Sequence, residues 1–281
     1  MNTDKARYNP GESVEIFVDL LNKTGTNFTG NVTLYFRYLG SQADTDQDKS
    51  VTLASNEAKT LTYSWTPPSD DYKGYLVEVW VRDENGTIID SSSTAVDVSS
   101  TWTKFPRYGY VSEFSDTTDT ANKTWELKNH HINGLQFYDW QWKHHIPNPD
   151  ASHAYWQDVG NRWISRNTVN NYIDSAHSYN MKAMNYNLIN GAFDNYWNDG
   201  VQLAWGLFKD SNGNYDPERQ DAHSLPPGWA SKKIYLSNPA NTDWQNYINS
   251  KESEVFKNFA FDGTSILWDP AGIYTIGTGT L

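Results

Sequence analysis

The sequence predicts a multidomain chain with a β part and an α/β part. We expect an N-terminal immunoglobulin-like β-sandwich over residues 1–100, then the first half of a (β/α)8 barrel over residues 101–281, truncated after about the fourth strand. Three observations support this prediction. Short runs of period two fill the first hundred residues, strands and helices alternate after them, and polar and aromatic residues follow the predicted strands.

The first hundred residues contain four runs in which apolar and polar residues alternate. These runs are residues 13–18, 31–36, 60–65 and 75–81. Turn signals such as Pro67-Pro68-Ser69 separate them, as expected between strands. Short strands at this spacing are typical of an immunoglobulin-like sandwich. The absence of cysteine excludes only the antibody-type disulfide.

The pattern changes after a polar stretch that ends at Pro106. The expected strands are 107–114, 132–140, 182–189 and one that begins at 261, and the expected helices are 119–129, 167–180 and 242–259. Asn241 or Thr242 is a candidate N-cap of the third helix. Residues 141–165 and 191–235 are expected to be long loops without core elements. Loops after parallel strands hold the active sites of (β/α)8 enzymes.

The charge and cysteine content exclude several classes of function. The net charge is −12 and the sequence pI is about 4.9, which argues against a nucleic acid or an anionic membrane as partner. Without cysteine, neither disulfides nor thiolate chemistry is available. The sequence contains no run of about 18 apolar residues, so it predicts no transmembrane helix. The first residues lack the apolar core of a signal peptide, so the protein is either cytoplasmic or a form from which the signal was removed.

The aromatic content points towards carbohydrate. The chain has 13 Trp and 18 Tyr at a mean hydropathy of −0.74. Aromatic faces stack on the apolar faces of sugar rings, so this composition is typical of carbohydrate-active proteins. The alternative is a sandwich core rich in aromatic residues.

The segment around 135–145 is the main candidate for substrate binding. Tyr138 and Asp139 end the second predicted strand, and Asp139 is interpreted either as a ligand of sugar hydroxyls or as a loop-capping carboxylate. Trp140 and Trp142 are candidates for stacking on sugar, with core packing as the alternative. His144-His145 has no acidic residue or cysteine at zinc-like spacing, so we predict hydrogen bonding there and no metal or cofactor.

Two further strand ends contribute candidates. Tyr110 and Glu113 end the first predicted strand, where a substrate-lining role and a structural ion pair or hydrogen bond are both open. Tyr186 and Asn187 end the third strand and are further substrate-binding candidates.

Several segments, in order along the chain, resemble glycoside hydrolase family 66, which contains dextranases and cycloisomaltooligosaccharide glucanotransferases. The segments are TDKARYNPG (3–11), FPRYGYVSEF (105–114), QFYDW (136–140), KAM (182–184), WGLF (205–208), DWQNYI (243–248) and FDG (261–263). The resemblance implies an extracellular enzyme with α-1,6-linked glucan as partner. It also implies retaining chemistry with two carboxylates about 5 to 5.5 Å apart, by hydrolysis or by transglycosylation to cyclic products.

The resemblance leaves the catalytic carboxylates in question. The family's nucleophile follows a pattern like Phe-Asp-Gly-x-His-x-Asp, and Leu267 stands at its last position here. Asp269 lies two residues further on in a different local pattern, and we expect the family's acid/base glutamate beyond this chain. Residues 264–281 match the family poorly, which suggests a frameshifted copy of a longer enzyme. We therefore expect a chain that is inactive alone. The alternatives are a non-catalytic glucan-binding protein and an unstable remnant.

Overall fold

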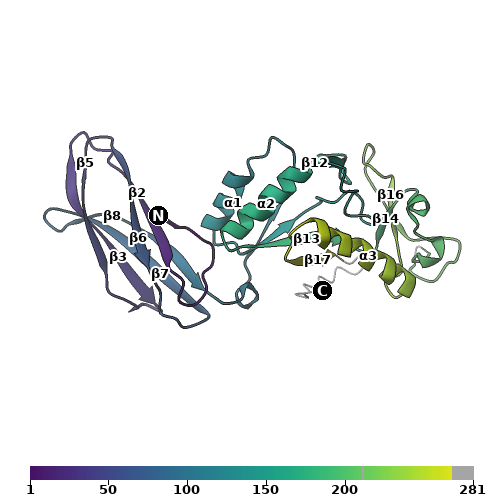
Figure 1. Cartoon of the computed structure of the whole chain (residues 1–281), viewed down its shortest axis with the longest axis horizontal. Coiled ribbons are helices and arrows are strands. Elements are labelled where there is room, and N and C mark those ends of the chain that lie inside the picture. The colour runs from purple at the N-terminus through teal and green to yellow at the C-terminus, as the bar shows by residue number, and fades with distance from the viewer. Residues whose placement is uncertain (211, 268–281) are drawn as a thin grey trace. The chain divides into compact units, whose positions relative to one another are not determined.

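The computed structural model describes residues 1–210 and 212–267 (Figure 1). The chain forms two compact units. The first comprises Met1–Tyr108 together with Thr124–Gly134 and His177–Met181, and the second comprises the remaining residues. Asp269 lies outside the described residues.

The first unit is built on two antiparallel sheets. One contains β1 (Asn2–Thr3), β2 (Val14–Leu21) and β6 (Ala58–Trp65). The other contains β3 (Phe28–Tyr38), β4 (Ser41–Gln42), β5 (Gln47–Leu53), β7 (Lys73–Asp83) and β8 (Ile88–Val98). Because successive side chains in a strand point to opposite faces, each sheet presents one apolar face.

The apolar faces of the two sheets share one core. Ile16 of β2 and Trp65 of β6 pack with Phe36 of β3 and Val77 of β7, and all four are buried. The Trp65 ring stacks on Phe36 with centroids 4.3 Å apart. Each fully buried side chain of this kind stabilises the fold by about 1.5–3 kcal/mol.

The four predicted runs correspond to β2, β3, β6 and β7, whereas β5 and β8 were not predicted. β5 (QDKSVTL) buries only Val51 and Leu53. β8 (IIDSSSTAVDV) is exposed over its first six residues and carries serines on both faces. Because so few of their side chains are buried, β5 and β8 lack the apolar period-two signal. Backbone pairing holds β5 to β3 and β8 to β7.

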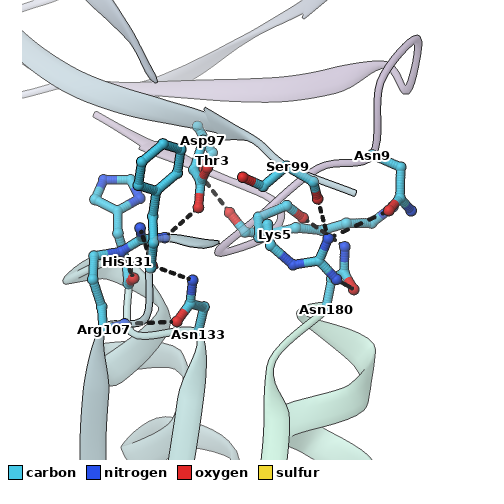
Figure 2. A network of polar contacts seen from close by, with 11 residues as sticks. Thr3, Lys5, Asn9, Asp97, Ser99, Arg107, His131, Asn133 and Asn180 are labelled. Carbon is cyan, nitrogen blue, oxygen red and sulfur yellow. Dashed lines mark hydrogen bonds and ion pairs between the residues drawn. The ribbon is translucent and has the colours of Figure 1, made fainter. Parts of the chain in front are cut away.

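A network of polar contacts joins distant segments of the first unit (Figure 2). The buried guanidinium of Arg7 donates to the Ser99 carbonyl and, over 2.7 Å, to Asn180 Oδ1. Asn180 Nδ2 donates back to the Arg7 carbonyl over 2.8 Å. The segment 177–181 is therefore bound to the N-terminal strand region.

A second part of this network centres on Arg107. Its guanidinium pairs with Asp97 at 2.5 Å and donates to the His131 carbonyl (Figure 2). Asn133 accepts from the Arg107 amide over 2.8 Å and donates to the Phe105 carbonyl over 3.0 Å. These bonds explain why residues 124–134 belong to the first compact unit although the sequence groups them with the α/β part.

The α/β part contains a four-stranded sheet whose order in space follows the order in the chain. Its strands are β9 (Tyr108–Val111), β10 (Gly134–Phe137), β13 (Lys182–Leu188) and β17 (Gly263–Leu267), and β13 and β17 are parallel. The helices α1 (Thr120–Asn129), α2 (Arg166–Ser178) and α3 (Thr242–Asn258) lie between successive strands in the chain. Asn241 is the N-cap of α3, because its side chain accepts from the Trp244 amide over 3.0 Å. Each of these elements was predicted within a few residues.

The two segments expected to be loops contain structure of their own, so that prediction was wrong. A hairpin of β11 (Tyr155–Gln157) and β12 (Trp163–Ser165) interrupts the first segment. The second forms an antiparallel sheet of β14 (Gly191–Phe193), β15 (Ala222–Ser224) and β16 (Lys233–Leu236). An apolar cluster of Val159, Leu188, Phe193, Ile234 and Leu236 packs these elements together. Strands of three or four residues are too short to show a period.

Short 3-10 helices complete the described elements. They are η1 (Trp102–Lys104), η2 (Tyr196–Asp199) and η3 (Leu203–Trp205). Within residues 1–210 and 212–267, no helix is both long enough and apolar enough to cross a membrane.

Candidate functional site

Two tyrosines come together where β10 ends beside β13. Tyr138 directly follows β10, and its ring centroid lies 4.8 Å from that of Tyr186 in β13, with 35° between the ring planes. Tyr138 is 41% exposed, whereas Tyr186 is only 6% exposed. Tyr186 therefore supports a neighbouring ring that solvent can reach, which is the arrangement needed for stacking on a sugar.

Asp139 lies next to this pair in an uncommon backbone conformation. Its φ is +53°, a left-handed value that aspartate tolerates better than most residues. The carboxylate Oδ2 lies 3.2 Å from Arg162 Nη2, and Arg162 Nε donates to Asp158 Oδ2 over 2.6 Å. Burial raises the pKa of Asp139 to about 6; Arg162 opposes this rise and Asp158 adds to it. The carboxylate can therefore accept hydrogen bonds at neutral pH and takes up a proton in mild acid.

Trp140 is a core residue, which corrects its assignment as a stacking platform. It is fully buried, and its indole Nε1 donates to Asn185 Oδ1 over 2.8 Å. Its ring packs against Phe259 and Phe261 at centroid distances of 4.8 and 5.1 Å. Both faces are closed to a ligand, so of the two interpretations the core packing is the one observed.

Trp142 is only half-buried and stays a candidate. Its ring stacks on His153 with centroids 6.2 Å apart, and the ammonium of Lys143 lies 4.4 Å from its centroid. A cation over an indole ring is favourable by about 0.5–1 kcal/mol at exposed sites.

The candidates of the first strand differ from each other in their surroundings. Tyr110 is 68% exposed on β9. Glu113 is exposed and pairs with Lys123 at 3.0 Å. An exposed pair of this kind contributes only about 0–1 kcal/mol to stability.

Asn187 points away from the tyrosine pair, so its side chain is not part of that surface. Residues 186 and 187 are neighbours in β13, and successive side chains alternate between the two faces of a strand. Asn187 is fully buried and donates to Glu252 Oε1 over 2.6 Å and to the His144 carbonyl over 2.8 Å. The side chain of Asn187, predicted as a substrate ligand, therefore forms buried hydrogen bonds on the other face of β13.

Glu252 is a residue that the sequence analysis missed. It occupies α3 on the same stripe as Trp244, Ile248 and Val255, all of them buried. A carboxylate in the apolar stripe of a helix is the signal that identifies such a residue, since charged groups are rarely fully buried unless paired. In Figure 1, α3 runs beside β13, and Asn185 and Asn187 of β13 bind Glu252.

His144 and His145 take part in buried hydrogen bonds, as predicted. His144 Nδ1 lies 3.0 Å from Asn187 Oδ1. His145 Nε2 lies 2.9 Å from Asp199 Oδ2, and its Nδ1 accepts from the Phe193 amide over 3.2 Å. Burial lowers the pKa of both imidazoles to about 4, so both are neutral at pH 7. Across residues 1–210 and 212–267, no group of three or more His, Asp or Glu side chains is arranged to hold a metal ion.

Leu267 ends the described part of the sheet. In the parallel ladder of β13 and β17, its backbone is in register with Leu188. The resemblance given in the sequence analysis implies an aspartate at this position.

Comparison with known proteins agrees with the resemblance drawn from the motifs. The chain is 38% identical over 271 residues to a cycloisomaltooligosaccharide glucanotransferase of Niallia circulans, a match that covers 94% of this chain and 27% of that protein. It is 29% identical over 204 residues to a dextranase of Streptococcus salivarius, covering 68% of this chain and 24% of that protein. The chain thus spans about a quarter of the length of these curated relatives.

A solved structure is similar over nearly the whole chain. It is a crystal structure of a Paenibacillus sp. cycloisomaltooligosaccharide glucanotransferase complexed with cycloisomaltoheptaose, with a TM-score of 0.83 and 36% identity. The similarity covers 95% of this chain and 37% of that one. The model of glycosyl hydrolase family 66 matches residues 3–272. The chain therefore belongs to glycosyl hydrolase family 66.

Proposed function

We propose that this chain supplies part of the glucan-binding surface of an α-1,6-glucan-active retaining glycosidase or transglycosylase. The observation that carries the proposal is the tyrosine pair: an exposed Tyr138 ring supported by Tyr186, directly before the largely buried carboxylate of Asp139. Family membership supports α-1,6-linked glucan as the substrate class.

Each side chain of this surface has a definite part. The Tyr138 ring stacks on the apolar face of a glucose unit. Asp139 accepts hydrogen bonds from its hydroxyls, and Arg162, bound to Asp139, keeps that carboxylate ionised above pH 6. Tyr110, exposed on β9, offers a further ring for the chain of sugars.

We further propose that this chain binds glucan without cleaving it. Retaining cleavage needs one carboxylate as nucleophile and a second as acid and base. Leu267 stands where the family pattern places the nucleophile, and a leucine side chain has no atom that can attack the anomeric carbon. On this view the four sheet strands and three helices belong to the first half of a (β/α)8 catalytic barrel, preceded by an immunoglobulin-like sandwich, in a secreted protein.

Affinity electrophoresis in dextran gels tests the binding surface. We expect dextran to retard the wild-type chain, Tyr138→Ala to abolish the retardation, and Tyr215→Ala, which removes a 78% exposed tyrosine elsewhere, to leave it unchanged. Equal retardation of wild type and Tyr138→Ala would contradict the proposal.

A reducing-sugar assay on dextran tests the absence of cleavage. Product release by the purified wild-type chain would show that a competent pair of carboxylates is present. A dedicated non-catalytic glucan-binding protein would give the same binding result. The encoding DNA separates the two, because only a fragment of an enzyme has a family-like reading frame downstream of codon 264.

A further inference from the structure

Glu252 is a buried carboxylate held by two amides. It is 7% exposed; its Oε1 accepts from Asn187 Nδ2 over 2.6 Å and its Oε2 from Asn185 Nδ2 over 2.8 Å. Among residues 1–210 and 212–267, no cation forms an ion pair with it. A buried charge of this kind is costly to keep, so the contacts that it makes require an explanation.

Neither asparagine can turn its amide around. Asn185 Oδ1 accepts from the indole Nε1 of Trp140 over 2.8 Å, and an indole N–H only donates. Asn187 Nδ2 also donates to the His144 carbonyl over 2.8 Å, and a carbonyl only accepts. Both NH2 groups are therefore fixed towards Glu252.

The carboxyl group consequently meets donors on both oxygens. A protonated carboxyl would have to turn its own O–H towards one of these two N–H groups. The observed arrangement is thus the arrangement of the ionised form. Burial raises the pKa of Glu252 to about 7, while the bonds from Asn187 and Asn185 lower it. Mild acidification therefore removes the negative charge that accepts from the two amides.

The two amides hold the segment that follows Asp139. Asn185 binds Trp140 through its indole. Asn187 binds His144 twice, through the carbonyl and through the imidazole Nδ1 at 3.0 Å. One carboxylate on α3 therefore fixes both ends of residues 140–144. Because Asp139 has a left-handed backbone, tertiary contacts of this kind must hold it there.

We propose that ionised Glu252 is a positioning residue of the glucan site. It does not touch the sugar; through Asn185 and Asn187 it fixes Trp140 and His144, and so holds the Asp139 carboxylate beside Tyr138. This inference rests on the proposed function, because it assumes that the surface at Tyr138 and Asp139 binds glucan.

The charged groups on the elements around Glu252 have other partners. Lys182 on β13 pairs with Asp262, which precedes β17. On α3, Lys257 pairs with Glu254 and the ammonium of Lys251 lies over the Tyr247 ring. The other pairs are Lys143 and His145 with Asp199, and Arg162 with Asp139 and Asp158. His144 faces Asn187 and is neutral at pH 7. The titration of Glu252 is therefore governed by its burial and the two amides.

A charge exchange tests the proposal with three variants and one control. Glu252→Gln keeps the shape of the side chain but turns its NH2 group towards the NH2 group of an asparagine. One buried hydrogen bond is thereby lost. We expect isomaltohexaose affinity, measured by calorimetry at pH 8, to fall about tenfold. Glu252→Gln with Asn185→Asp restores every pair: the new amide donates to the new carboxylate, which still accepts from the Trp140 indole. We expect this double variant to bind within about twofold of wild type, since every donor again meets an acceptor.

The other exchange must fail. Glu252→Gln with Asn187→Asp turns a carboxylate towards the His144 carbonyl, so affinity stays at least as low as in the single variant. Glu254→Gln, at a half-exposed position two residues along α3, is the control and binds like wild type. Wild-type affinity should also fall as the pH drops from 8 through 7, and this step should be absent in Glu252→Gln.

The outcomes separate this inference from the proposed function. Wild-type affinity in Glu252→Gln, or no recovery in the Asn185 exchange, overturns the positioning role. If Glu252→Gln does not fold, a folded Asn185 double variant supports the donor and acceptor assignment and an unfolded one refutes it. A wild-type chain that does not bind isomaltohexaose refutes the proposed function and the positioning role with it. The folding of the exchange variants, followed by circular dichroism, still tests the amide lock.

Discussion

Replacing Glu252 by methionine should change stability with a defined pH dependence. Burial raises the pKa of this carboxyl to about 7 in the folded chain, against 4.5 for an unperturbed glutamate. At about 1.4 kcal/mol per pKa unit, the buried charge costs the folded state about 3 kcal/mol above pH 7. Glu252→Met removes that cost but leaves the NH2 groups of Asn185 and Asn187 without one acceptor each, at about 1–3 kcal/mol apiece. The two effects nearly offset each other at pH 8.

The sign of the pH effect follows from proton binding. Between pH 4.5 and 7 the folded chain holds a proton on Glu252 that the unfolded chain has lost, so the free energy of unfolding rises as the pH falls through this window. Methionine does not titrate. The difference in unfolding free energy, wild type minus Glu252→Met, should therefore grow by about 3 kcal/mol from pH 8 to pH 4.5.

Urea denaturation at pH 8, 6.5 and 4.5 measures this difference, because the other titrating groups cancel between the two proteins. Glu254→Met on the exposed side of α3 serves as control and should show a constant difference. A difference that stays flat, or that shrinks in acid, would mean that the amides outweigh burial and that the folded pKa lies at or below 4.5. Stability and positioning should thus move in opposite directions as the pH falls, the first increasing and the second decreasing.

Three further predictions concern other parts of the chain. Wild-type affinity for isomaltohexaose should fall as the pH drops through about 6, where the Asp139 carboxylate takes up its proton, and Asp139→Asn should remove this fall. Calorimetry at pH 5, 6 and 7.5 measures the affinities. An unchanged pH profile in the variant would exclude Asp139 as the titrating group. Trp140→Phe deprives the buried Asn185 Oδ1 of its donor and should lower the unfolding free energy by about 1–3 kcal/mol in urea, against little change for Trp163→Phe at a 62% exposed position. Asp97→Asn breaks the 2.5 Å pair with Arg107 and should destabilise the first unit by about 1–3 kcal/mol, whereas Asp90→Asn on exposed β8 should be neutral; equal midpoints in thermal unfolding would show that the pair contributes nothing.

The regular elements could be predicted from the sequence because their side chains carry a period. β7 buries every second side chain from Tyr75 to Val81, and α3 begins with an asparagine cap and has an apolar stripe. β8 and β14 to β16 could not be predicted in this way. β8 is paired through its backbone, and its first six residues are exposed. β14, β15 and β16 are only three or four residues long.

The surroundings of the candidate residues could be predicted only in part. Tyr138 and Asp139 follow β10, as the predicted strand implied. Trp140 was harder, because its burial comes from Phe259 and Phe261, about 120 residues further along the chain. Asn187 illustrates a limit that the strand itself sets. Tyr186 and Asn187 cannot both face the same side, and the sequence alone did not say which of them lies beside Tyr138.

The bond between Arg7 and Asn180 has a consequence for biosynthesis. The two residues are separated by 173 positions, and the guanidinium is buried in the folded unit. At about 5–20 residues per second, roughly 10–35 s pass on the ribosome between the synthesis of one and of the other. During that interval the nascent sheets can pair and Arg7 can donate to the Ser99 carbonyl, but it lacks its second partner, Asn180. The first unit can therefore complete its folding only after the second helix of the following part has been made.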